Sequence, residues 1–454
     1  AGYIAMHLAR IFAVPFVYTG HSLGRSKLQK LMGNGMRDGD VNKKFKIGHR
    51  IATEEDILAN ADLVVTSTRQ EIKEQYGLYE NKDMPKFVVN PPGIDIDKFY
   101  PFYHNMLSEN GFIEDAMYAQ ASMLKELNRF FLRSDKPLIL ALCRPDKRKN
   151  ISGLIQAFGE DLELQMMANL AIFAGLRKDI DIMEENEREV LTQMLLLMDK
   201  YDLYGKMAIP KKHDFEFEVP ALYRIAADTR GVFINPALVE PFGLTLLEAS
   251  ATGLPIVATD DGGPVDIVRN CENGFLVNPK KPENIATVIK KIISDPQIWE
   301  EYSKSGVLNV RKHYTWKQHA ATYVKRVDQL MSKSTATDMD TAMPRDTIGR
   351  RLLSLRSFLI TDIDHTLIGD DNTRLHELIS LIKANSACLG FGVATGRTID
   401  SARDLLVRHS IPPPDVIISS VGAEIYYGPS NHFGQGWATH VLSLIHISEP
   451  TRPS

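Results

Sequence analysis

Short runs of apolar residues alternate along the chain with longer stretches in which apolar residues recur every three or four positions. The short runs are rich in Val, Ile, Leu and Phe and are bounded by Gly, Pro, Asn or Asp, so they predict strands. Most of them lack a strict polar–apolar alternation, which is typical of strands buried on both faces of a parallel sheet. The predicted strands are residues 14–19, 63–67, 87–90, 138–143, 170–174, 206–210, 231–235, 255–259 and 274–277.

The longer stretches predict amphipathic helices. Residues 187–203 carry an apolar face, and we expect Gly205 to follow this helix as its C-terminal cap. Residues 283–294 and 302–312 show the same periodicity. This alternation of strands and helices predicts an α/β fold with parallel sheets.

Residues 332–350 interrupt the pattern, because they have no periodicity and little apolar surface to bury. We predict an interdomain linker; a long surface loop within one domain is the alternative, although such loops are uncommon in compact domains. A new strand pattern begins at 357–363. The last residues, 442–454, read LSLIHISEPTRPS and resemble translated sequencing-adapter read-through, so we expect a non-native tail, with a natural polar tail as the alternative.

Composition excludes several classes of protein. Of the 454 residues, 44% are hydrophobic and 24% charged, which excludes a disordered, collagen-like or coiled-coil chain. The 53 basic and 57 acidic residues nearly balance, so nothing global points to nucleic acid. Three widely spaced cysteines exclude a disulfide framework and favour a reducing, cytoplasmic compartment. No apolar run predicts a membrane span and no leader is visible; because the first residue is not Met, we expect the natural start to be absent.

Two carboxylates, Glu240 and Glu248, stand eight residues apart around a Gly-containing turn that follows a predicted strand. We expect Glu240 in the loop and Glu248 about one turn inside the next helix. The backbone N–H groups of Phe242, Gly243 and Leu244 then lie at a helix N-terminus, which attracts a diphosphate. Glu248 can accept hydrogen bonds from a ribose and Glu240 from sugar hydroxyls; two solvated glutamates are the alternative.

A basic pair follows the strand predicted at 138–143. Arg144 and Lys149 can bind a pyrophosphate, the first as a planar fork and the second as a point charge. Asn150 is a suitable N-cap for the helix predicted at 151–158. The basic and the acidic motif both lie at carboxyl ends of parallel strands, where open α/β sheets bind ligands. A basic surface loop is the alternative.

The pattern Arg-x4-Lys followed by Glu-x7-Glu resembles the donor site of retaining glycosyltransferases of the GT-B architecture, in which two Rossmann-like domains face a cleft. Over roughly residues 1–330 the chain resembles the sucrose-phosphate synthase family. The matching segments are TGHSLGR, TSTRQEI, NPPGID, RPDKRKNISGLIQAFGE, DKYDLYG, VPALYRIAA and GVFINPALVEPFGLTLLEASATGLPIVATDDGGPVDI. The resemblance implies glucose transfer from UDP-glucose to fructose 6-phosphate with retention, giving sucrose 6-phosphate and UDP without a metal cofactor.

The resemblance also implies roles for single residues. Arg144 and Lys149 should hold the diphosphate of UDP-glucose, Glu248 the ribose and Glu240 the glucose hydroxyls. His21, in GHSLGR, should lie near the glucose in the first domain. The expected catalytic set is therefore His21, Arg144, Lys149 and Glu240, and the expected donor contacts add Phe242, Gly243, Leu244 and Glu248.

Local charge suggests the acceptor. Residues 21–50 carry eight Lys or Arg against two Asp, an excess of +6 that favours an anionic ligand. A nucleic-acid surface would interleave aromatic residues, and only Phe45 is present. A sugar phosphate such as fructose 6-phosphate fits better, with Lys27 and Arg50 as the expected phosphate contacts; a solvated basic surface accounts for most of the other charges.

Two departures from the family pattern matter. Residues 174–179 read AGLRKD where plant relatives look more like GNRDD, so no donor role is assigned to Arg177. The Gly-rich loop of the first domain, which the family uses to bind donor and acceptor, is missing because the chain begins after it, and its absence can leave this chain inactive.

A second chemistry follows the linker, where an apolar strand ends in Asp362-Ile-Asp364-His-Thr366. Just past a strand end the two aspartates can converge on one Mg²⁺, with Asp362 as nucleophile, Asp364 as proton shuttle and Thr395 as a hydroxyl from another strand end. With ATGR and SVGAEI nearby, the segment resembles haloacid-dehalogenase-like sucrose-phosphate phosphatases; a calcium-type acidic loop is the alternative. The chain ends before the family's later Lys and acidic pair, so we expect weak Mg²⁺ binding and no phosphatase activity.

We therefore predict an α/β, GT-B chain with these parts: 1–110, a partial N-terminal Rossmann-like acceptor domain; 111–331, a Rossmann-like UDP-glucose domain; 332–350, a linker; 351–441, a partial haloacid-dehalogenase-like domain; and 442–454, the tail. The expected partners are UDP-glucose and fructose 6-phosphate, without nucleic acid or membrane. Sucrose synthase, or another retaining glycosyltransferase, is one alternative, and the basic segment 21–50 argues against it. A non-catalytic sugar-phosphate sensor is the other, and the intact donor set argues against it.

Overall fold

The structure, a computed structural model, describes residues 2–11, 14–20, 22–33, 35–103, 112–211, 213–334, 355, 357–364, 366–369, 372–428 and 432–433. Their contacts divide the chain into two compact units. The larger unit is formed by residues 19–47 and 63–329, and the smaller by 1–18, 48–62 and 330–454.

The larger unit is built on a six-stranded parallel sheet with the strand order β6-β5-β4-β7-β8-β9. The strands are β4 (Leu138–Cys143), β5 (Asn169–Ala174), β6 (Met207–Ala208), β7 (Val232–Asn235), β8 (Ile256–Thr259) and β9 (Gly274–Val277). The chain moves outward from β4 to β6, returns to β7 on the other side of β4, and then moves outward to β9. The strand order therefore reverses between β4 and β7, which is where open α/β sheets bind ligands.

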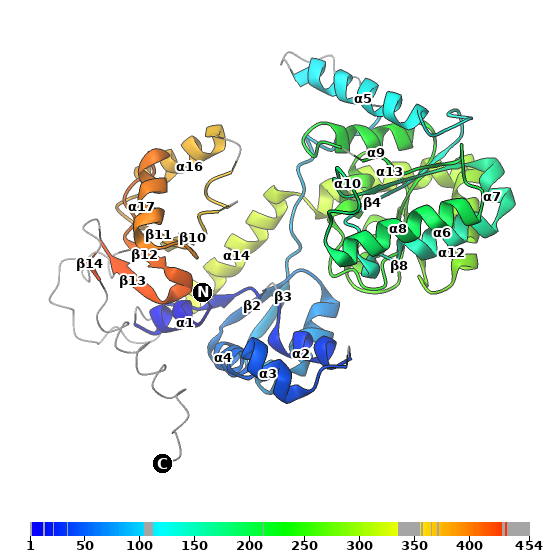
Figure 1. Ribbon diagram of the computed structural model, residues 1–454. Helices are drawn as coiled ribbons and strands as arrows, with labels where there is room; N and C mark the ends of the chain where they lie inside the picture. Colours follow the sequence, from blue (N-terminus) through cyan, green and yellow to red (C-terminus); the bar gives the residue numbers. More distant parts are fainter. Residues whose placement is uncertain are drawn as a thin grey trace. The chain divides into compact units, whose positions relative to one another are not determined.

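Helices cover both faces of this sheet (Figure 1). One face carries α6 (Ile151–Glu160), α7 (Leu162–Met167), α8 (Glu185–Lys200) and α12 (Pro282–Ser294). The other carries α9 (Glu218–Asp228), α10 (Leu244–Ala251) and α11 (Gly263–Cys271), with α5 (Phe112–Asn128) packed on α9 and α13 (Pro296–His313) on α10 and α11. Because the strands are covered on both sides, β4, β5, β7 and β8 are almost wholly buried, as their continuous apolar runs predict.

The predicted strands of this sheet are all confirmed: 138–143 and 274–277 match at both ends, and the ends of the others shift by at most two residues. Two helix predictions need correction. Helix α13 starts at Pro296, capped by the Asp295 carboxylate, and is longer than predicted. Gly205 does not cap α8, which ends at Lys200 with Tyr201 as its C-cap; Gly205 has φ +78° in the turn beyond, where its carbonyl accepts from Leu132 N at 2.9 Å.

The N-terminal part of the larger unit contains α2 (Gly24–Gly33), α3 (Asp38–Phe45) and the parallel strands β2 (Leu63–Thr66) and β3 (Lys86–Val89). A π-helix (Glu71–Gln75) and 3-10 turns (Tyr76–Leu78 and Glu80–Asp83) lie between these strands. Gln70 joins this part to the loop after β8, donating to Asp261 and accepting from Gly262 N, both at 2.5 Å.

The smaller unit contains a sheet in the order β10-β11-β12-β13-β14, parallel from β10 to β12 and antiparallel thereafter. Its elements are β10 (Ser357–Thr361), α16 (Asn372–Ala384), β11 (Leu389–Ala394), α17 (Ile399–Arg408), β12 (Val416–Ser419), a 3-10 turn (Ser420–Gly422), β13 (Glu424–Tyr427) and β14 (His432–Phe433). The unit also holds α1 (Gly2–Ile11), β1 (Val17–Tyr18) and α4 (Ile47–Asn60) from Gly48 on. Ile4 and Leu8 of α1 pack against Val416, Ile418 and Ile425.

The predicted linker 332–350 and the predicted tail 442–454 lie mostly or wholly outside the residues that the structure describes. Helix α14 (Trp316–Ser334) continues into the first residues of the predicted linker, and residues 335–350 lie outside the described residues. The tail 442–454 also lies outside them. Among the helices described, none is long and apolar enough to cross a bilayer.

Candidate active site

The loop after β4 forms a short 3-10 turn, Lys147–Lys149. The Asp146 carboxylate caps this turn by accepting from Arg148 N at 2.9 Å, and it also pairs with the Arg148 guanidinium. That pairing lowers the pKa of Asp146 to about 2. The turn leaves Arg144 exposed, without an ion pair to any residue that the structure describes, while Lys149 is half-buried.

Asn150 departs from the prediction. It precedes α6, but its side chain makes no cap, and its backbone is left-handed with φ +52°. Its side-chain amide instead donates to the carbonyl of Pro279 at 2.7 Å, which ties the loop after β4 to the loop before α12. A tertiary hydrogen bond therefore replaces the local cap that the sequence suggested.

Glu240 lies in the loop after β7 and is only 8% exposed. Its Oε2 accepts from Lys149 Nζ at 2.6 Å and from Asn235 Nδ2 at 2.9 Å. The Glu240 carbonyl accepts from Gly263 N at 3.1 Å, and Gly262, with φ +84°, leaves no room for a Cβ against that carbonyl. The basic and the acidic motif thus meet at the strand-order reversal, as their positions at neighbouring strand ends predict.

Glu248 lies inside α10 and is also 8% exposed. Its Oε2 accepts a hydrogen bond from the hydroxyl of Tyr223, on α9, at 2.8 Å. Burial raises the pKa of Glu248, whereas the Tyr223 hydrogen bond and the charge of Lys98 oppose that rise. Helix α10 begins at Leu244, directly after Gly243 with φ +99°, so the expected phosphate-facing amides of Phe242, Gly243 and Leu244 do lie at a helix N-terminus.

The loops after β5 and β6 wall a cavity of about 590 Å³ lined by Leu176, Arg177, Lys178, His213, Asp214 and Glu218. Arg177 is buried, and its guanidinium donates to the carbonyls of Ile209 and Pro210, both at 2.9 Å. Its backbone N–H donates to the Lys211 carbonyl at 3.0 Å. Arg177 therefore joins the loop after β5 to the loop after β6, at the same end of the sheet as the predicted donor-binding residues.

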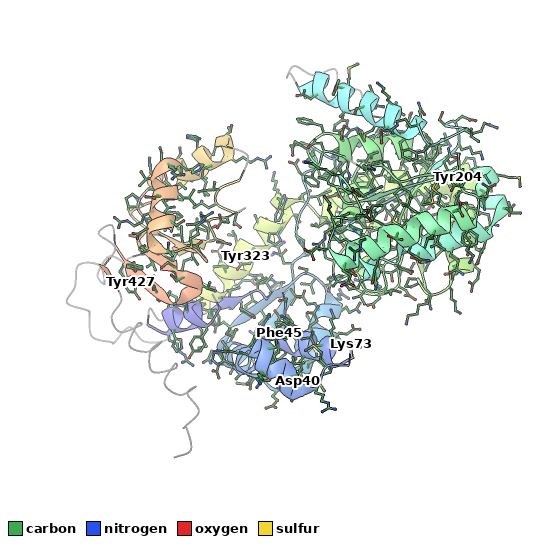
Figure 2. All side chains as sticks on the ribbon, in the orientation of Figure 1. Asp40, Phe45, Lys73, Tyr204, Tyr323 and Tyr427 are labelled. Atoms are coloured by element: carbon green, nitrogen blue, oxygen red, sulfur yellow. The ribbon has the colours of Figure 1, made fainter. Side chains whose placement is uncertain are left out.

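Three further residues of the predicted transferase site are His21, Lys27 and Arg50. His21 lies outside the described residues. Lys27, exposed on α2, stacks over the ring of Phe45 at 4.8 Å, and Lys44 stacks over the same ring; Figure 2 labels Phe45. Arg50, in the smaller unit, pairs with the buried Glu54 at 2.9 Å. The role of His21 near the glucose and the roles of Lys27 and Arg50 in acceptor binding stay predictions.

In the phosphatase-like part, the two aspartates of the motif have different partners. Asp364 forms a forked pair with Arg397 of the ATGR segment, with contacts of 2.6–3.1 Å. Asp362 accepts from the adjacent Ile363 N at 2.7 Å. Thr366 is exposed, and the buried Thr395 accepts from Arg397 N through its hydroxyl at 3.2 Å. In the described part of the chain no three His, Cys, Asp or Glu side chains group as metal ligands.

Sequence reasoning missed three residues that hold the donor carboxylates and their loop: Asn235, Tyr223 and Gln70. Asn235 and Tyr223 lie within the INPALVEP and VPALYRIAA segments, but nothing local shows that each contacts a glutamate. Gln70 lies in TSTRQEI, far from its partners in the chain. The contacts of Tyr223 and Gln70 join elements that only the fold brings together, whereas Asn235 lies five positions before Glu240.

Comparison with known proteins identifies two families that parts of the chain match. Residues 124–307 match the family model of glycosyl transferases group 1, and residues 355–447 match that of sucrose-6F-phosphate phosphohydrolase. Sucrose-phosphate synthase 4 of Arabidopsis thaliana is 40% identical over 432 residues, covering 87% of this chain. The chain is homologous to sucrose-phosphate synthases. The sucrose-phosphate synthase of Zea mays is 44% identical over 357 residues, or 72% of the chain.

The chain spans 41% of the Arabidopsis relative and 33% of the maize one. Among solved structures, the sucrose-phosphate synthase of Thermosynechococcus elongatus aligns with a TM-score of 0.53 at 26% identity, covering 73% of this chain and 72% of that one. HepE of Anabaena, solved with UDP, aligns with a TM-score of 0.52 at 15% identity over 72% of this chain and 76% of that one, a likeness of fold alone. The predicted GT-B fold with a haloacid-dehalogenase-like part is confirmed.

Proposed function

We propose that the chain acts as part of a sucrose-phosphate synthase that transfers glucose from UDP-glucose to fructose 6-phosphate with retention, in sucrose biosynthesis in the cytoplasm. The observation that carries the proposal is the meeting of Lys149, Glu240 and the N-terminus of α10 at the strand-order reversal, with Glu248 one turn further on. Identity of 40–44% to curated sucrose-phosphate synthases supports it.

The diphosphate would be held by charge. Arg144 is exposed and can form a forked contact with the diphosphate. Lys149 carries a single localised charge, which in this structure is paired with Glu240. With the amides that begin α10, these cations would stabilise the negative charge that develops on the departing UDP. The enzyme's other task is to orient glucose and acceptor, which alone can remove a large part of the barrier.

Glu240 would change partners during binding. In this structure its buried carboxylate is neutralised by Lys149. When a diphosphate attracts Lys149, Glu240 keeps the Asn235 amide and can accept hydrogen bonds from glucose hydroxyls. His21 would face the same glucose from the first domain, and Lys27 and Arg50 would bind the acceptor phosphate; these three roles rest on the resemblance and on the local excess of +6.

We further propose that the phosphatase-like part does not hydrolyse sucrose 6-phosphate. Its family uses Mg²⁺, but Asp364 is paired with Arg397 and the described residues do not form a metal site. The described residues of this part therefore do not fit the ion.

The test compares UDP-glucose consumption by a protein carrying these residues with fructose 6-phosphate and with fructose. We expect turnover with fructose 6-phosphate only, and loss of turnover in Lys149→Met. Equal turnover with both sugars would favour a sucrose synthase, and UDP-glucose binding without transfer to either would favour a sensor.

A further inference from the structure

The carboxylates of Glu240 and Glu248 accept hydrogen bonds from different kinds of donor, and the donor to Glu248 is Tyr223. Glu240 rests against a cation and an amide, whereas Glu248 accepts a neutral hydroxyl, that of Tyr223, at 2.8 Å. Tyr223 is wholly buried on α9. It lies in the segment VPALYRIAA, but the sequence alone assigned it no role. Its position on a different helix from Glu248 makes it able to fix the carboxylate from outside α10.

Packing leaves the Tyr223 hydroxyl little freedom. The Tyr223 ring packs edge-on against the rings of Phe99 and of Phe233 on β7, with distances between ring centroids of 6.0 Å and 5.4 Å. Burial raises the pKa of Tyr223 well above its usual value, so the phenol stays protonated and is the donor in this hydrogen bond. A rigid donor aimed at Oε2 restricts rotation of the carboxylate and directs Oε1 toward other donors.

We propose that Tyr223 is a positioning residue that orients Glu248 for a ribose diol and thereby sets the preference for ribonucleotides over 2′-deoxyribonucleotides. The inference rests on the proposed function, because it takes UDP-glucose as donor. Sites built to hydrogen-bond a hydroxyl discriminate strongly against an analogue that lacks it, since the protein group is then left unpaired. A carboxylate free to rotate can lose that contact more easily and should discriminate less.

The test is calorimetric titration of the full chain with UDP and with 2′-deoxy-UDP. We expect the wild type to prefer UDP by about tenfold or more, as for a hydroxyl bound to a charged group. Tyr223→Phe keeps the ring and removes only the hydroxyl; it should reduce this preference by about threefold or more while changing the affinity for 2′-deoxy-UDP by less than about twofold.

The matched control is Tyr201→Phe. Tyr201 also donates to a glutamate, Glu160, at 3.1 Å, but that pair is on the α6–α8 side of the sheet and should leave the preference unchanged. Because the preference is a ratio measured on one preparation, partial unfolding cancels from it.

Four outcomes would overturn the inference. An unchanged preference in Tyr223→Phe would show that the hydroxyl does not orient Glu248. An equal loss of affinity for both nucleotides would show a structural role only. Wild-type protein that binds both nucleotides equally would show that Glu248 does not read the ribose. Wild-type protein that binds neither would overturn the proposed function together with this inference.

Discussion

Lys149 and Glu240 form an ion pair, and replacing one or the other should change the affinity for UDP in opposite directions. Glu240→Gln removes the charge that holds Lys149 but keeps the shape of the side chain and the Asn235 contact. Lys149 is then free to meet a diphosphate, so UDP should bind more tightly, whereas glucose transfer should fall because the glucose hydroxyls lose a charged acceptor. Lys149→Met should weaken UDP binding and transfer alike.

The structure sets the size of these effects. At 2.6 Å, two unit charges attract by about 6 kcal/mol at an effective dielectric constant of ~20, and desolvation opposes most of this. The side chains are 26% and 10% exposed, so we expect a net coupling of about 1–3 kcal/mol in a double-mutant cycle of unfolding. If a fraction of this coupling is released, UDP affinity should rise about two- to tenfold in Glu240→Gln, and it should fall about ten- to a hundredfold in Lys149→Met.

Calorimetry with UDP and chemical unfolding of the same samples test this prediction. Lys290→Met is the matched control, because Lys290 is 24% exposed and pairs with Asp161 at 2.8 Å and Glu163 at 2.6 Å on α12 and α7. It should lower stability without changing UDP affinity. A fall in UDP affinity in Glu240→Gln equal to that in Lys149→Met would refute the idea that the two ligands compete for Lys149.

Four further predictions concern single residues of the site. Glu248→Ala should weaken UDP and UDP-glucose equally, by about 1.5–3 kcal/mol, because both contain the ribose; unchanged UDP affinity in calorimetry would remove Glu248 from the site. Since burial raises the pKa of Glu248 and only the ionised carboxylate accepts from both hydroxyls, UDP binding should weaken on acidification at a higher pH than an exposed glutamate would cause. The weakening should be smaller in Glu248→Gln, as titrations across pH would show. In a full-length parent that carries these residues, Lys27→Ala should raise the KM for fructose 6-phosphate far more than that for UDP-glucose; equal changes in the two KM values would show that Lys27 is structural or contacts the donor. With Mg²⁺ present, the chain should release no phosphate from sucrose 6-phosphate, because Arg397 occupies Asp364; release that Asp362→Asn abolishes would contradict this pairing.

The sequence predicts those parts of the site that depend on neighbours in the chain. A buried strand followed by Arg144 and Lys149, and another followed by Glu240, place these residues at strand ends whatever the rest of the fold does. Asn150 shows the limit, because its expected cap is replaced by a hydrogen bond to Pro279, 129 positions away. Tyr223 and Gln70 could not be assigned for the same reason: their contacts depend on how α9 packs beside α10 and on how the loop after β8 meets the N-terminal segment.

Burial of the two donor glutamates explains why the site needs these extra residues. A carboxylate that is 8% exposed loses most of its hydration, and without hydrogen bonds it would take up a proton or destabilise the fold. Glu240 receives a cation from the loop after β4 and an amide from the last residue of β7, both at the strand-order reversal, and Glu248 receives a phenol from α9. In each case the bonded oxygen is Oε2, so a sugar hydroxyl can meet a desolvated, oriented Oε1 with little reorganisation. A Glu-x7-Glu motif supplies only the carboxylates; groups from the neighbouring strand ends and from helix α9 hold them in place.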